Sequence, residues 1–140
     1  MKRRLILMGV LLAVAVAAAS CGAQAGLATD YAGVVDGIRA EGADVTPAGG
    51  VTQEFLSAKG QAVTVNGEQV QVFEYADESA AEADASRVSP DGGTVGTTMI
   101  SWVATPHFFR SGRVMVLYVG DDASTLKVLE TVLGPQFAGR

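Results

Sequence analysis

Few residues of this sequence carry side chains suited to catalysis, and His107 is the first to consider. It is the single histidine among the 140 residues. A catalytic histidine needs a nucleophile or a carboxylate within hydrogen-bonding reach, and no motif around His107 supplies one. We therefore expect a structural or exposed histidine. The alternative is a hydrolase-like enzyme that pairs His107 with a carboxylate.

Asp121 and Asp122 are adjacent carboxylates, a pairing that also occurs in metal sites. An aspartate just before an apolar helical pattern is, however, typical of a helix N-cap, where its oxygen accepts backbone N–H groups. Asp77 holds the same place before an earlier helical segment, which favours capping for both. With one histidine and no cysteine other than Cys21, we expect no metal site and no cofactor.

Residues 106–110, Pro-His-Phe-Phe-Arg, form a candidate contact surface. Adjacent side chains of a regular strand point to opposite faces, so Phe108 and Phe109 are not both expected to point inward. The favoured interpretation is a bulge or a wrapped loop that buries both, and the alternative is that one of them is exposed to a partner or a membrane. The candidate partner-binding residues are Trp102, His107, Phe108, Phe109 and Arg110.

The segment Val114–Val119 is apolar at every position. A strand with one face in water alternates between apolar and polar residues, so this pattern predicts a central strand with both faces covered. Phe73, Tyr75 and Trp102 are expected on its second face. A helix around residues 31–38 is the preferred cover. A second copy, another protein or a small apolar ligand are the alternatives.

That first helix has apolar residues at i, i+3, i+4 and i+7 from Tyr31, and Thr29 or Asp30 is placed to cap it. Gly33 and Gly37 lie one helical turn apart. Because glycine is unfavourable inside a helix, their presence indicates close packing, which we expect to be against a sheet.

The clearest strand signal is a hairpin. Ala62–Val65 and Gln69–Phe73 flank Asn66-Gly67, the pair favoured in a two-residue type I′ turn. Residues 43–60 predict only short edge strands, on either side of a turn at Pro47–Gly50.

A second hairpin is predicted with strands over 97–110 and 113–119 and a turn at Ser111-Gly112. Each hairpin leads to a helix behind an aspartate, Asp77 or Asp122. The sequence therefore predicts an α+β fold with a mainly antiparallel sheet of four to six strands. Two hairpin–helix (ββα) units build the sheet, with both helices on one face, and an N-terminal helix precedes them.

The N-terminal residues have the pattern of an export signal. Lys2-Arg3-Arg4 is followed by an unbroken run of 15 apolar residues and glycines, residues 5–19. This run is shorter than the roughly 20 residues that span a bilayer as a helix, so a signal peptide is favoured over a transmembrane helix.

The run ends in Ala18-Ala19-Ser20-Cys21, which resembles the lipobox of bacterial lipoproteins. In that family an aliphatic residue and two small residues precede a cysteine that is diacylated and becomes the mature N-terminus. Ala18 stands where the family usually has leucine. The resemblance covers residues 1–21 and is shared with small uncharacterised envelope lipoproteins. It implies export, lipidation of Cys21 and anchorage to a membrane of the cell envelope.

A second cleavage site gives an alternative. Ala23-Gln24-Ala25 fits ordinary signal-peptidase cleavage before Gly26, which would produce a free secreted protein. In the lipoprotein interpretation, residues 1–20 are the signal peptide, 21–28 a flexible tether and 29–140 a single domain.

The net charge of the chain limits the classes of partner that it is expected to bind. After residue 20 the chain keeps seven Lys and Arg against all fifteen Asp and Glu, a formal net charge of −8. Such a protein repels phosphate backbones, so we expect no nucleic-acid partner. The favoured function is a non-enzymatic, membrane-anchored binding or interaction module, monomeric rather than dimeric. Its partner is expected to be an envelope protein or a small apolar ligand. An extracytoplasmic enzyme and a purely structural envelope component are the alternatives.

Overall fold

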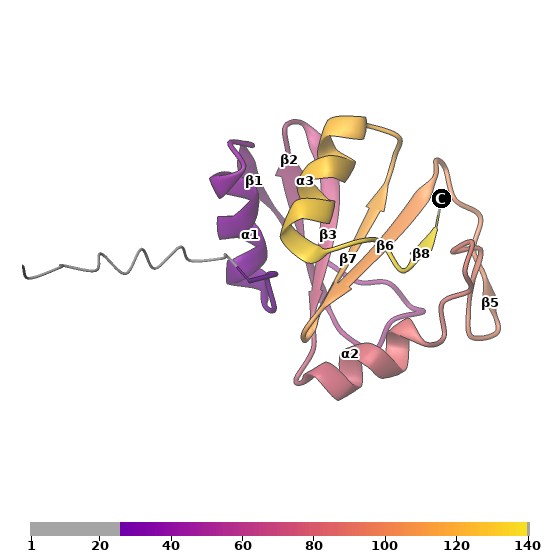
Figure 1. The fold of residues 1–140 in the computed structure, drawn as a ribbon. Coiled ribbons are helices and arrows are strands. Elements are labelled where there is room, and N and C mark those ends of the chain that lie inside the picture. The colour runs from indigo at the N-terminus through magenta and orange to yellow at the C-terminus, as the bar shows by residue number, and fades with distance from the viewer. Residues whose placement is uncertain (1–25, 140) are drawn as a thin grey trace, which may run out of the picture.

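The computed structural model describes residues 26–139, which are built around a six-stranded sheet (Figure 1). The strand order is β1-β2-β3-β7-β6-β8, and every neighbouring pair is antiparallel. The predicted α+β class with a mainly antiparallel sheet is confirmed. The sheet strands are β1 (Val45–Val51), β2 (Gly60–Val65), β3 (Glu68–Glu74), β6 (Pro106–Ser111), β7 (Val114–Val119) and β8 (Ala138–Gly139).

Three helices lie in the described residues: α1 (Tyr31–Ala40), α2 (Glu78–Ala85) and α3 (Ala123–Leu133). Each begins behind an aspartate, and the carboxylates of Asp30, Asp77 and Asp122 accept the backbone N–H three residues on at 2.7, 2.8 and 2.7 Å. These bonds satisfy N–H groups that have no partner inside a helix. The predicted capping by Asp77 and Asp122 is confirmed.

The first hairpin has the predicted turn. Asn66 and Gly67 both have positive φ, 49° and 89°, as a type I′ turn requires, and Val63 lies opposite Val70. This register places Val63 and Val70 on one face of the sheet and Gln71 on the other.

The second hairpin differs from the prediction in two ways. Ser111 pairs with Val114, so Gly112 and Arg113 form the turn, and the φ of 55° at Gly112 suits the first position of a type II′ turn. The strand before the turn begins at Pro106, not at residue 97. The reason is that β4 (Thr94–Val95) and β5 (Thr98–Met99) pair with one another in a separate small sheet.

Side chains of the sheet divide the core into two layers. The valines of β2 and β3, together with Val114 and Val116 of β7, point to the first face, where α1 and α3 cover them. Phe73, Met115 and Leu117 point to the second face, where α2 and the loops around residues 51–58 and 88–102 cover them. Phe73, Tyr75 and Trp102 therefore belong to the second face, as predicted.

The predicted placement of the helices is wrong. The helices after the two hairpins, α2 and α3, lie on opposite faces, and α1 lies beside α3 rather than on the second face (Figure 1). The chain before α1 explains this arrangement. The Ala28 N–H donates to Val132 O at 2.9 Å and the Arg113 N–H donates to Thr29 O at 3.3 Å, which fixes α1 next to α3. Ala28, expected in the flexible tether, is thus bonded to the folded domain.

Gly37 accommodates this helix contact. A Cβ atom built there would lie 2.8 Å from Cγ1 of Val132 on α3, so glycine permits α1 and α3 to approach closely. The close packing expected of this glycine is present, but its neighbour is a helix and not the sheet.

In residues 43–60 the expected edge position is confirmed, but the predicted turn at Pro47–Gly50 and the strand bounds are wrong. Pro47 and Gly49 are not in a turn but within the edge strand β1, where a bulge separates them. Proline offers no N–H at an edge and a bulge interrupts the ladder, and both features discourage further strand pairing. Gln53 and Leu56 form a turn, with the Leu56 N–H donating to Gln53 O at 3.0 Å.

A buried carboxylate holds the β1–β2 loop against the second face. Asp84 Oδ2 accepts hydrogen bonds from Ser57 N (2.6 Å), Ser57 Oγ (2.8 Å) and Tyr75 Oη (2.9 Å), and Asp84 Oδ1 lies 3.2 Å from Arg87 Nη1. Burial alone raises the pKa of Asp84, but these hydrogen bonds together hold that pKa below its usual value. Because they fix Ser57, they also position nearby Phe55.

We expect Asp84→Asn to lower the free energy of unfolding at pH 7 by about 1–3 kcal/mol, because it removes the charge from a buried hydrogen-bonded cluster. The pKa of Asp84 is lower in the folded than in the unfolded state. Its contribution is therefore present above the ordinary aspartate pKa and is lost as the pH falls through the folded-state pKa. Urea unfolding of wild type and Asp84→Asn at pH 7 and pH 3 measures this contribution to the free energy of unfolding.

The difference between wild type and Asp84→Asn should shrink at pH 3. Glu82→Gln, at an exposed position on the same helix, is the control and should change stability little. An equal loss for Asp84→Asn at both pH values would contradict the role given to the charge.

Candidate functional site

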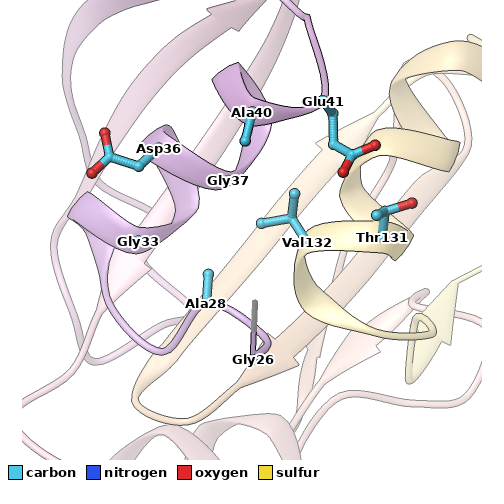
Figure 2. Close-up of a pocket in the computed structure, with 9 residues that line it drawn as sticks. All are labelled: Gly26, Ala28, Gly33, Asp36, Gly37, Ala40, Glu41, Thr131 and Val132. Atoms are coloured by element: carbon cyan, nitrogen blue, oxygen red, sulfur yellow. The ribbon is translucent and has the colours of Figure 1, made fainter. Parts of the chain in front are cut away.

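Three surface cavities in the described residues bear on function. The first, of about 350 Å³, lies between α1 and α3 and is lined mostly by small residues (Figure 2). It is hollow because Gly33, Gly37 and Ala28 have little or no side chain, and Gly37 is required for contact with Val132. Figure 2 shows the Asp36 carboxylate pointing away from the hollow. Helix packing accounts for this cavity without a ligand.

The second cavity, of about 340 Å³, reaches His107 on the first face. The imidazole is 4% exposed, with Nδ1 2.6 Å from Gln136 Oε1 and Nε2 3.0 Å from Gly120 O. A neutral ring donates from Nε2 to the backbone carbonyl and accepts at Nδ1 once the Gln136 amide turns its nitrogen inward. An imidazolium donates at both positions. Both ring nitrogens are engaged in either form.

The surroundings of His107 favour a structural role. Its ring stacks on Tyr118, with centroids 6.0 Å apart and planes 20° from parallel. Glu130 is the carboxylate in the cavity wall, and among the described residues no carboxylate is hydrogen-bonded to the imidazole. The pairing that a hydrolase-like mechanism requires is not formed here.

The third cavity, of about 510 Å³, lies on the second face, and we call it the second-face groove. Its floor is the beginning of β3, where the residues alternate with the first-face valines. Its wall comes from the loop after β1 together with the loop after β5, which meet where Phe55 contacts Trp102. The residues that matter most here are Gln53, Phe55, Gln69, Gln71, Ser101 and Trp102.

Trp102 forms the rigid wall of the second-face groove. Its Nε1–H donates to Gly92 O at 2.7 Å, which fixes the indole. Its ring makes edge-to-face contacts with Phe55 and with buried Phe108, and the centroids are 5.9 Å apart in each pair. Val103, next in the chain, is 98% exposed at the margin of the groove. An aromatic surface of this kind is pre-formed, so little ordering is required of it on binding.

Amide side chains form the floor. Gln53 Nε2 donates to Gln71 Oε1 at 2.8 Å, and Gln69 is exposed two residues before Gln71 on the same face of β3. Glu68 lies at the margin, but its carboxylate accepts the Tyr118 hydroxyl at 2.9 Å on the first face. The groove thus combines an aromatic wall with a floor of uncharged amide side chains beside Val119.

The expected burial of both Phe108 and Phe109 is confirmed, and the alternative in which one of them is exposed to a partner is wrong. Phe108 is 0% and Phe109 is 2% exposed, although the pairing of β6 with β7 is regular and has no bulge. The two rings do point to opposite faces, as expected of a strand, but each face has its own core. Neither ring is therefore available to a partner.

The five candidate binding residues do not form one surface. Trp102 lines the second-face groove with Phe108 beneath it, whereas His107 lies on the other face. Arg110 reaches α2, where its Nη1 is 3.8 Å from Glu78 Oε1. Cys21, the predicted lipidation site, lies outside the described residues.

The sequence interpretation did not identify the amide floor or Phe55 as site residues. A signal for the floor was present, because the alternation in β3 places Gln69 and Gln71 on the face that also carries Phe73. No comparable signal marks Phe55, whose position depends on the Asp84 cluster and on distant Trp102.

Within residues 26–139, no group of three or more His, Cys, Asp or Glu side chains is arranged to hold a metal ion. In the same part of the chain, no helix is long and apolar enough to cross a bilayer. Comparisons of the chain with protein-family models, curated proteins and solved structures returned no match.

We expect His107→Ala to lower the free energy of unfolding by about 2–4 kcal/mol, because it leaves a cavity and removes the donor to the part-buried Gly120 carbonyl. Chemical denaturation measures the change. Glu130→Gln in the wall of the same cavity is the control and should change stability by less than about 0.5 kcal/mol. A fully stable His107→Ala variant would contradict the structural role.

Proposed function

We propose that this chain is a non-enzymatic binding module, held at a membrane of the cell envelope through Cys21, which takes its ligand in the second-face groove. The observation that carries the proposal is the groove itself, where the fixed indole of Trp102 faces an uncharged amide floor. Ligand sites in proteins typically combine an apolar wall with a few placed polar groups. The volume of about 510 Å³ is suited to a small molecule or part of a larger one.

The groove is built on well-anchored elements. Its floor belongs to β3, which pairs on both sides, with β2 and with β7. Its walls are tied down by the hydrogen bonds of Asp84 to Ser57 and of Trp102 to Gly92. Sites held by such supports keep their geometry before the ligand arrives.

A monomeric state is part of the proposal. The first face of the sheet is covered by α1 and α3 and the second by α2 with two loops, all from the same chain. The large apolar strands therefore need no second copy to remove them from water.

We also propose that the domain consists of two hairpin–helix units, β2–β3–α2 and β6–β7–α3, preceded by α1. The aspartate caps at equivalent points, Asp77 and Asp122, support this division, and the pairing of β3 with β7 joins the units. The helices of the two units, α2 and α3, pack on opposite faces of the sheet. Each unit therefore covers a different layer of the core.

The proposed anchor is compatible with an open groove. The described chain begins at Gly26, beside the cavity between α1 and α3 on the first face. The second-face groove is on the other side of the sheet. Gly26, the described residue nearest to Cys21 in the sequence, is therefore on the opposite side of the sheet from the groove.

Export and lipidation are tested at Cys21. We expect Cys21→Ser to leave the precursor unprocessed or to release the protein from the membrane fraction, because the serine hydroxyl does not replace the acylated thiol. Cell fractionation and mass spectrometry of the mature N-terminus measure this, with Ser20→Ala as the control that keeps a small residue before the cysteine. A wild-type protein that begins at Gly26 would contradict the anchor.

Ligand binding is tested through Trp102, the single tryptophan of the chain. A neutral apolar probe, N-phenyl-1-naphthylamine, should quench or shift the Trp102 fluorescence in a saturable way. Gln69→Glu adds a charge to the floor and should weaken this binding about tenfold, which corresponds to about 1.4 kcal/mol.

Gln61→Glu is the matched control, because Gln61 is exposed on β2 and belongs to the first-face register. It should leave the affinity for the probe unchanged. A wild-type protein whose Trp102 fluorescence does not respond to the probe would contradict a ligand site in the groove.

A further inference from the structure

The polar side chains of the second-face groove share one property. The amides of Gln53, Gln69 and Gln71 and the hydroxyl of Ser101 each carry both a hydrogen-bond donor and an acceptor. This combination complements a ligand hydroxyl, which also donates and accepts. Phosphate and carboxylate groups only accept, and would leave half of the lining unused.

The charges around the groove also favour an uncharged ligand. The charged residue at the margin of the groove is Glu68, and its carboxylate is engaged by the Tyr118 hydroxyl on the first face. An anionic ligand would therefore lose hydration in the groove and would meet no charge other than the like charge of Glu68. The lining suits a neutral molecule.

The amides are ordered and regularly spaced. Gln69 and Gln71 are two residues apart on one strand, so their side chains leave the sheet roughly 7 Å from one another. The hydrogen bond from Gln53 Nε2 to Gln71 Oε1 orients both amides. It leaves the Gln71 NH₂ group free to donate and the Gln53 carbonyl oxygen free to accept.

The aromatic wall has the shape of a corner. The planes of Trp102 and Phe55 are 84° apart, so the rings meet edge-to-face and form no parallel-sided slot. Proline-rich peptides dock in grooves between aromatic side chains, for which this corner is poorly shaped. A corner beside a polar floor instead suits a ring that has an apolar C–H face and a rim of hydroxyl groups.

The floor of the groove does not allow an extended peptide to bind by strand addition. The backbone of β3 is hydrogen-bonded to β2 on one side and to β7 on the other. Strand addition requires a free sheet edge, and the groove lies over the middle of the sheet.

From these observations we infer that the second-face groove binds a neutral saccharide, whose C–H face lies on Trp102 and whose hydroxyl groups bond the glutamine floor. This inference rests on the proposed binding function of the groove. The groove volume of about 510 Å³ accommodates a short oligosaccharide.

The experiment titrates the protein with neutral oligosaccharides, namely cellotriose, maltotriose and N,N′,N″-triacetylchitotriose, and follows the fluorescence of Trp102. At least one should give a saturable change. Gln71→Leu keeps the size of the side chain but removes its amide, and should weaken that saccharide at least about tenfold. Gln61→Leu, on the first face, is the matched control and should leave the affinity unchanged.

A second measurement separates folding from recognition. Binding of N-phenyl-1-naphthylamine should persist in Gln71→Leu, because the apolar wall remains, and its persistence shows that the variant is folded. Loss of saccharide binding with retained probe binding supports the inference. Saccharide binding that is equal in wild type and Gln71→Leu would overturn it, since the amide floor would not be used.

Two further outcomes separate a failure of the saccharide inference from a failure of the proposed binding function. If wild-type protein binds the probe but none of the saccharides, or binds a proline-rich peptide instead, the saccharide inference fails and the proposed binding function stands. If neither the probe nor any saccharide changes the fluorescence of Trp102, both fail.

Discussion

Strand β7 is buried on both faces, and most of the architecture follows from the need to cover it twice. Val116 and Leu117 point in opposite directions and both are 0% exposed. The first face receives two helices with broad aliphatic stripes, α1 and α3. The second face receives only the short, alanine-lined α2, which is too narrow to cover the whole sheet. The loops after β1 and β5 complete the cover, and the amide end of β3 between them is left accessible as the second-face groove.

Two buried or half-buried polar side chains, Asp84 and Trp102, hold the loops that cover the second face of the sheet. A buried carboxylate is costly unless several donors reach it, and Asp84 has such donors from Ser57, Tyr75 and Arg87. The cluster therefore ties a loop to a helix with a strength that alanine contacts alone would not give. Trp102 has a similar part on the other loop, with its N–H bonded to Gly92 and its ring packed on Phe108. The two loops meet where Trp102 contacts Phe55, so the groove wall is shared between them.

Local signals predicted local structure well in this chain. The Asn66-Gly67 turn and the aspartate caps depend on a few adjacent residues, and they lie where the sequence placed them. The layer to which each helix belongs depends on contacts between distant segments, such as Ala28 with Val132, and its prediction was wrong. Phe108 and Phe109 show the same limit. Strand alternation correctly separated their directions, but only the tertiary structure shows that both directions lead into a core. Residues 45–51 were misjudged because proline and glycine mark a bulged edge strand as readily as a turn.

The charge of the domain links the proposed anchor to the proposed ligand. A chain that carries a net charge of −8 after residue 20 gains no attraction to anionic lipid headgroups, so its residence at a membrane would depend on the lipid at Cys21. The same charge disfavours anionic ligands at long range, before any contact is made. A neutral ligand experiences no such field, and its recognition depends on short-range contacts with Trp102 and the glutamine floor. Binding in the groove should consequently depend little on ionic strength, because a neutral ligand carries no charge whose attraction to the groove salt can screen.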